Sequence, residues 1–143
     1  MKTKQGTLLL LRGLPGAGKT TLASTIAALD GAMEHWQVAI WAADQHFEQS
    51  DGTYKFNGAE LPLAHRKCQE GTERSMRAGM ALVCVTNTFT TEEELEWYYD
   101  AAKRYNYKVH SVIVENRCGT QNVHGVPAEA MSKMRERFNV SLG

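Results

Sequence analysis

The sequence predicts an α/β fold, in which helices flank a parallel sheet and a phosphate-binding loop joins the first strand to the first helix. Two observations lead to it. Apolar runs of strand length alternate with amphipathic segments of helix length. A glycine-rich segment of the phosphate-loop type stands between the first such pair. With 143 residues the chain has the length of one domain, so we expect residues 1–143 to fold around a single core.

The strands are predicted from short apolar runs. Residues 6–12 form the first run. Residues 37–43 (QVAIWAA) and 80–86 (MALVCVT) read as buried strands, because parallel strands covered on both faces are almost continuously apolar. Residues 107–115 (YKVHSVIVE) alternate more, which places this strand nearer a sheet edge.

The helices are predicted from periodicity and end signals. Residues 19–29 carry an apolar stripe that stops at an Asp-Gly pair. Further helices are expected over residues 61–78, 91–104 and 127–138, the second with an acidic first turn and the third opening on proline. The irregular segment 47–58 is expected to hold a small hairpin around Tyr54 and Phe56. Its place between a strand and a helix makes it a candidate acceptor-site loop.

Charge and hydropathy exclude some classes of partner. Lysine plus arginine and aspartate plus glutamate number 16 each, so no net basic field attracts duplex DNA and any nucleic-acid contact must be local. No apolar run is long enough to cross a bilayer, and the N-terminal MKTKQG has no signal-peptide apolar region behind it. We therefore expect a cytoplasmic protein with no membrane partner. The three cysteines have no metal-ligand spacing, which favours reduced thiols.

The segment GLPGAGKT fits the pattern G-x-x-x-x-G-K-[ST] and stands between a strand and a helix, as the mechanism of phosphate binding requires. The glycines let the backbone curl so that its N–H groups point inward, and the helix N-terminus favours an anion. Lys19 is expected to reach the β and γ phosphates, and Thr20 to offer its hydroxyl to Mg²⁺. The residues expected to bind the nucleotide are Gly13, Leu14, Pro15, Gly16, Ala17, Gly18, Lys19, Thr20 and Thr21.

Polar residues follow two of the predicted strands. Asp44 comes directly after VAIWAA, at the carboxyl end of a strand, where open α/β sheets bind their ligands. Its carboxylate can accept the proton of an acceptor hydroxyl, orient that hydroxyl or help to hold Mg²⁺; it can also cap a helix. Many P-loop enzymes end the next strand with an aspartate that holds magnesium-bound water, but this chain has Thr86 there, which leaves the metal to Thr20, the nucleotide and Asp44. Asn87 and Thr88 are candidates for binding water or substrate, or form a turn.

The phosphate loop alone does not choose a reaction, since GTPases, motors, transporters and kinases share it. The chain has no N-K-x-D guanine-specificity motif, which counts against a GTPase switch, and it is short for a ring ATPase with a helical lid. A small kinase that binds ATP and Mg²⁺ fits best. A nucleotide-dependent binding module with slow hydrolysis is the competing class.

An ordered set of segments carries a likeness to a known family. The segments are GLPGAGKTT, Asp44 after the second strand, DGTYKF (51–56), AHRKC (64–68), TNT (86–88) and HGVPAEAMSKMRERF (124–138). From about residue 7 to residue 138 the chain resembles the polynucleotide-kinase-like P-loop kinases, especially a branch that includes phage DNA kinases acting on 5-hydroxymethyluracil. The resemblance implies one kinase domain with a short lid, ATP and Mg²⁺ as cofactors, DNA as substrate and no obligate protein partner. It also implies the host cytoplasm as location if the protein is phage-encoded.

Carried over residue by residue, the resemblance implies that Lys19 and Thr20 handle ATP and magnesium and that Asp44 is the general base. It also implies that an arginine from a lid beyond the fourth strand stabilises the γ-phosphoryl group. The lid segment NRCGTQNV contains one arginine, Arg117, which is the candidate for this role or a solvated surface residue. The resemblance implies that Arg137 lies near the nucleotide. Without the resemblance, the sequence indicates that Arg137 belongs to a solvated basic face.

The residue three positions after Asp44 bears on the acceptor. Kinases of 5′-hydroxyl ends resemble this chain but carry an arginine there, which grips the acceptor's phosphate. This chain has Phe47, which can stack on a base for about 1–3 kcal/mol or lie in the core. The preferred acceptor is therefore 5-hydroxymethyluracil in DNA, extruded or single-stranded, ahead of a 5′-hydroxyl end and of a small metabolite or nucleoside.

Two predictions concern the helix over residues 61–78. His65 shares a stripe with Leu61, Cys68, Thr72 and Met76 that is expected to face the sheet, so it is a buried histidine or a substrate contact. Basic residues of this helix are a candidate local surface for DNA: Arg66, Lys67, Arg74 and Arg77.

Overall fold

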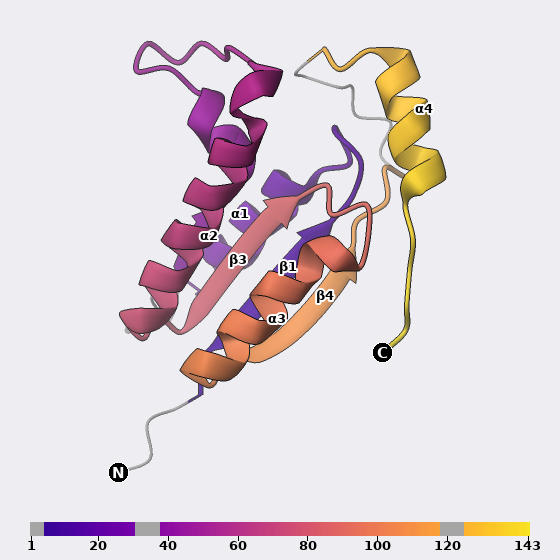
Figure 1. Ribbon diagram of the computed structural model, residues 1–143. Coiled ribbons are helices and arrows are strands. Elements are labelled where there is room, and N and C mark those ends of the chain that lie inside the picture. Colours follow the sequence, from indigo (N-terminus) through magenta and orange to yellow (C-terminus); the bar gives the residue numbers. More distant parts are fainter. Residues whose placement is uncertain (1–4, 31–37, 118–124) are drawn as a thin grey trace.

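The computed structural model describes residues 5–30, 38–117 and 125–143. Four strands form one parallel sheet: β1 (Thr7–Arg12), β2 (Val38–Trp41), β3 (Leu82–Asn87) and β4 (Lys108–Ile113). Their spatial order is β2-β3-β1-β4, so β1 lies inside the sheet between β3 and β4 (Figure 1). This arrangement confirms the α/β fold class.

Helices cover both faces of the sheet. They are α1 (Lys19–Asp30), α2 (Leu61–Arg77), α3 (Glu93–Tyr105) and α4 (Ala128–Arg137), with short 3-10 helices at Ala43–Phe47 (η1) and Gly58–Glu60 (η2). Figure 1 shows α2 and α3 in front of the sheet, α1 behind it, and α4 beside the end to which β3 and β4 point. In the part of the chain that the structure describes, no helix is both long and apolar enough to cross a membrane.

Side chains along each strand point alternately to the two faces of the sheet, and each face has its own hydrophobic core. Leu8 and Leu10 of β1 face α2 and α3, where they join a cluster that includes Phe47 and Tyr98. Leu11 faces the other way and belongs to the smaller cluster on the α1 side. Because β1 and β3 are buried on both faces, their continuously apolar sequences have a direct physical cause.

The sequence predicts the exposure of one edge strand correctly and that of the other wrongly. β4 is an edge strand with mostly exposed residues, which confirms the expectation drawn from its alternation. β2 was expected to be buried, and that expectation is wrong: all four residues are half-buried, because β2 is an edge strand of the described sheet, next to β3. The apolar residues of β2 pack on both faces of the sheet: Val38 and Ile40 join the core on the α1 side, and Trp41 lies over Gly71 of α2.

The acidic first turn of α3 and the proline at the start of α4 are present as expected. The first turn of α3 contains Glu93, Glu94 and Glu96, and the helix ends at Asn106 with a left-handed φ of 57°. Pro127 is the N-terminal flanking residue of α4. The expected hairpin in the irregular segment is present as an isolated antiparallel bridge between Glu48 and Tyr54.

Candidate functional site

The phosphate loop connects β1 to α1 and has the conformation that its glycines allow. Gly16 and Gly18 have φ values of 81° and 97°, which other residues adopt only with strain. A side chain at Gly13 would place its Cβ only 2.6 Å from the carbonyl oxygen of Val114. The loop is anchored to β3 because the amide of Gly13 donates to the carbonyl oxygen of Thr88, at 3.2 Å. Thr88 itself is half-buried.

Lys19, the first residue of α1, folds back over the loop. Its Nζ donates to the carbonyl oxygens of Gly13 and Leu14, at 2.7 and 3.0 Å. Burial lowers the pKa of Lys19 from 10.5 to about 8, and the negative charge of Asp44 opposes this shift. Lys19 and Asp44, separated in sequence, therefore lie within electrostatic reach of each other, as their predicted positions at one edge of the sheet require.

Asp44 lies in the first turn of η1, just beyond the carboxyl end of β2, and is exposed. It is not the helix N-cap, which was the alternative reading: Ala42 holds that position and no side chain caps the helix. Tyr54, from the loop that follows, donates its hydroxyl to Asp44 Oδ1 at 3.3 Å. The carboxylate is thus presented to solvent next to the phosphate loop.

The two threonines considered for the metal differ in their exposure to solvent. Thr20 is exposed on the first turn of α1, and Thr86 is buried near the end of β3. In strand alternation Thr86 falls on the same face as Leu82 and Cys84, which pack on the α1 side. Among the described residues the Thr86 hydroxyl has no hydrogen-bond partner. A buried hydroxyl of this kind can bind a water molecule or an ion's water shell.

Two expected substrate contacts are engaged in the core instead. Phe47 is 1% exposed, with its ring packed against those of Tyr54 and Phe56, so the expected stacking of Phe47 on a base does not fit the structure. Asn87 is buried: its Oδ1 accepts from the amide of Ala43 at 2.9 Å, and its Nδ2 contacts the sulfur of Cys68. Asn87 therefore ties η1 to β3 and is not available to substrate in this structure.

The buried stripe of α2 agrees with the expected one at Cys68, Thr72 and Met76 and differs from it at Leu61 and His65, which are exposed. It consists of Ala64, Cys68, Gly71, Thr72, Ser75 and Met76. His65 is exposed, so its assignment to a face against the sheet is wrong. Trp41 packs against the buried face of α2: its Nε1 donates to Ser75 Oγ at 2.9 Å, and its ring leaves no room for a Cβ at Gly71.

The expected arginines lie on the surface. Arg117 pairs with Glu115 at the end of the lid segment's described part, and residues 118–123 of that segment fall outside the described residues. Arg137 donates through Nε to Thr90 Oγ1 at 3.0 Å, so it joins α4 to the loop after β3. On α2, Arg66 and Lys67 are exposed, while Arg74 covers the Trp41 ring and Arg77 pairs with Glu73.

The sequence analysis missed a buried arginine directly before the phosphate loop. Arg12 is 2% exposed, and each of its three nitrogens donates a hydrogen bond. Nε donates to the carbonyl oxygen of Phe89 at 3.0 Å, one terminal nitrogen to Glu92 at 3.0 Å and the other to the carbonyl oxygen of Asn139 at 2.6 Å. The ring of Phe138 lies 4.8 Å from the guanidinium carbon.

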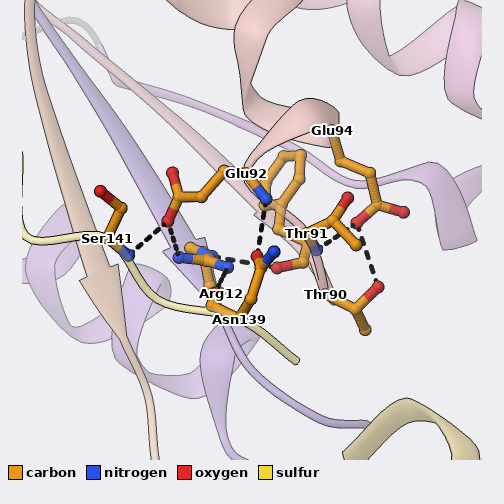
Figure 2. Close-up of polar contacts among 8 residues, drawn as sticks. Arg12, Thr90, Thr91, Glu92, Glu94, Asn139 and Ser141 are labelled. Carbon is orange, nitrogen blue, oxygen red and sulfur yellow. Dashed lines mark hydrogen bonds and ion pairs between the residues drawn. The ribbon is translucent and has the colours of Figure 1, made fainter. Parts of the chain in front are cut away.

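These contacts fix the segment after α4 against the start of α3 (Figure 2). Asn139 accepts from the amide of Glu92 at 2.9 Å, and the amide of Ser141 donates to the Glu92 carboxylate at 3.0 Å. Arg12 thus joins the phosphate loop's first residue to two distant parts of the chain. The available sequence signal was a single charged residue at the end of an otherwise apolar strand.

A comparison of the sequence with models of known protein families finds one match over most of the chain. The model of the family described as an AAA domain matches residues 8–139, a span that includes the sheet, the phosphate loop and α4. The chain belongs to this AAA domain family. A human protein, NEDD4-binding protein 2, is 27% identical to this chain over an alignment of 138 residues, which covers 92% of the chain but only 8% of that protein.

Solved structures agree with the fold of this AAA domain. Kti12 from Chaetomium thermophilum, in complex with ADP-AlF3, has a TM-score of 0.65 and 11% identity and covers 93% of this chain and 80% of its own. An APS kinase from Mycobacterium tuberculosis, in complex with AMPPNP and APS, has a TM-score of 0.58 and 13% identity and covers 78% of this chain and 63% of its own. The fold is therefore that of a P-loop kinase-like domain.

Proposed function

We propose that this AAA domain is an ATP-dependent kinase that transfers the γ-phosphoryl group to a hydroxyl on DNA, with the 5-hydroxymethyl group of 5-hydroxymethyluracil as the preferred acceptor. The observation that carries the proposal is that Lys19, after the phosphate loop, and the exposed Asp44, after β2, lie at the same edge of the sheet, where the charge of Asp44 acts on the lysine. It brings a cation on the phosphate-donor side within reach of a carboxylate exposed to an acceptor. Phosphoryl transfer is catalysed chiefly by such positioning and charge stabilisation.

The proposed step uses residues on both sides of the reacting phosphorus. Asp44 takes the proton of the acceptor hydroxyl as its oxygen bonds to the γ-phosphorus. The bond from this phosphorus to the β,γ-bridging oxygen breaks, and ADP leaves with the electron pair. Lys19 and the loop amides offset the charge, and we assign Arg117 to the same role and Arg137 to nucleotide binding.

The threonines near the loop fit Mg²⁺ as a partner of ATP. Thr20 offers an exposed hydroxyl, and the Thr86 hydroxyl is buried with no partner among the described residues. Mg²⁺ keeps several waters and takes few protein ligands, so a hydroxyl that holds such a water replaces the strand-end carboxylate. When bound, the ion neutralises charge on the β and γ phosphate oxygens.

The loop after Asp44 supports a base as the carrier of the acceptor hydroxyl. Because Phe47 is buried, we assign base stacking to Phe56, which is 59% exposed and whose ring centroid is 5.1 Å from that of Phe47. Position 47 lacks the arginine of the kinases of 5′-hydroxyl ends that the chain resembles. Exposed Arg66 and Lys67 at the start of α2 are the proposed local contacts for the DNA backbone.

The test offers labelled ATP with acceptors that differ by one hydroxyl. Two single-stranded oligonucleotides carry a 5′-phosphate and differ at one base, which is 5-hydroxymethyluracil in the first and thymine in the second. A third has thymine and a free 5′-hydroxyl, nucleosides form a fourth sample, and the fifth has no acceptor. The proposal predicts label only in the first oligonucleotide.

Each other outcome selects a different function. Label in the third oligonucleotide alone indicates a kinase of 5′-hydroxyl ends, and label in the nucleosides alone indicates a small-molecule kinase. ATP binding with no label in any acceptor refutes the kinase assignment and leaves a nucleotide-dependent binding module.

A further inference from the structure

The loop that follows Asp44 is held in a defined shape by its own hydrogen bonds. The amide of Gln49 donates to the carbonyl oxygen of Thr53 at 2.7 Å, and the amide of Lys55 donates to the carbonyl oxygen of Phe47 at 2.9 Å. At the tip, Gly52 has a φ of 87°, and Asp51 accepts from both the amide and the hydroxyl of Thr53. These bonds form the short hairpin in which Tyr54 is bridged to Glu48.

The hairpin places the Tyr54 side chain between the core and Asp44. Its ring stands edge-on to the buried Phe47 at 6.0 Å between centroids, and its hydroxyl donates to Asp44 Oδ1 at 3.3 Å. Burial, followed by the charge of Asp44, raises the pKa of Tyr54 to about 12. The hydroxyl therefore keeps its proton at neutral pH and remains a hydrogen-bond donor to the carboxylate.

We propose that Tyr54 is a positioning residue, which fixes the rotamer of the Asp44 carboxylate so that this carboxylate meets the acceptor hydroxyl. The inference rests on the proposed function, because Asp44 must be the base. The geometric reason is that the hairpin holds the Tyr54 hydroxyl at a carboxylate that is exposed on a 3-10 helix of five residues, and the hydrogen bond fixes one orientation of that carboxylate. General-base catalysis depends on hydrogen-bond reach between base and proton, so a donor that holds the carboxylate increases the fraction of productive geometries.

Tyr54→Phe tests this, since it removes the hydroxyl and keeps the ring against Phe47. We expect kcat for transfer to fall about tenfold, as for the loss of one rather long hydrogen bond to a charged group. ATP affinity and the thermal unfolding midpoint are expected to stay at their wild-type values. In an Asp44→Asn background the same change should have no further effect, because Tyr54 acts only through the carboxylate.

A matched control is available in a hydrogen bond that joins α3 to α2. Tyr105 donates its hydroxyl to Glu73 Oε1 at 2.7 Å, which is also a tyrosine-carboxylate hydrogen bond. Tyr105→Phe is expected to leave kcat unchanged. A merely structural role for a tyrosine hydroxyl would affect stability in either variant.

Three results would overturn the positioning role. They are an unchanged kcat in Tyr54→Phe, a tenfold loss that persists in the Asp44→Asn background, and a loss of kcat that follows a lowered unfolding midpoint. If the wild-type protein transfers no phosphate, the proposed function fails, and the positioning role fails with it. A wild-type protein that transfers phosphate while Tyr54→Phe does so equally well refutes the positioning role alone.

Discussion

Raising the pH from 7 to 9 should weaken ATP binding by removing the proton of Lys19. In the nucleotide-free protein burial lowers the pKa of this lysine from 10.5 to about 8. At 1.36 kcal/mol per pKa unit, the difference corresponds to at most about 3 kcal/mol of cost for keeping the buried ammonium charged. The charges of bound phosphates stabilise the protonated lysine. ATP binding at pH 8 should therefore be accompanied by the uptake of about half a proton by Lys19, and the affinity for ATP should fall about tenfold per pH unit above pH 8.

Calorimetric titration with ATP at pH 7, 8 and 9, in buffers of different ionisation enthalpy, measures both the affinity and the proton uptake. Lys19→Arg is the control, because arginine keeps its charge throughout this range and removes the lysine's contribution to proton uptake. Equal proton uptake by the wild type and this variant at pH 8 would refute the reasoning.

The same shift has a consequence for folding. Because the pKa of Lys19 is lower in the folded protein than in the unfolded chain, the unfolded chain binds more protons between about pH 8 and pH 10.5. The free energy of unfolding of the nucleotide-free protein should therefore rise with pH across this window, relative to Lys19→Met, by at most about 3 kcal/mol. Urea unfolding of both proteins at pH 7.5 and 10 measures this difference, and a difference that falls with pH would contradict it.

The remaining predictions concern packing. Arg12→Met should lower the free energy of unfolding by about 1–3 kcal/mol, because it removes the donor of two carbonyl oxygens and the ion-pair partner of Glu92; an unchanged free energy in urea unfolding would be inconsistent with the buried network. Gly71→Ala should destabilise by about 1–2 kcal/mol although alanine favours helix, because its Cβ would lie 2.5 Å from the Trp41 ring. Gly58→Ala is its control, since the nearest side-chain atom there is at an ordinary 3.7 Å and no loss is expected.

The strands and the phosphate loop were predictable because their causes are local. β1 and β3 are continuously apolar since helices cover both of their faces, and the glycines of the phosphate loop occupy conformations that only glycine adopts easily. The place of Asp44 was predictable for the same kind of reason: a carboxylate directly after an apolar strand lies at the edge where such sheets bind ligands.

The parts that sequence reasoning missed depend on contacts between distant residues. Arg12 looks like the end of a strand, and its partners lie 77, 80 and 127 positions away. The buried face of α2 includes Gly71 and Ser75, which contact Trp41 of β2, whereas His65 lies outside it. Phe47 and Phe56 have equal hydrophobicity, and only the hairpin between them decides that the first is buried and the second exposed.

The most direct test of the central claim separates ATP binding from phosphoryl transfer in Asp44→Asn. The asparagine keeps the size of the side chain and leaves the phosphate loop intact, so the ATP dissociation constant should stay within about threefold of the wild type. Transfer of labelled phosphate to the acceptor should fall by about 10²–10⁴, the usual contribution of a general base. Retained transfer, or an equal loss of binding and transfer, would contradict the assignment of Asp44 as the base of a kinase.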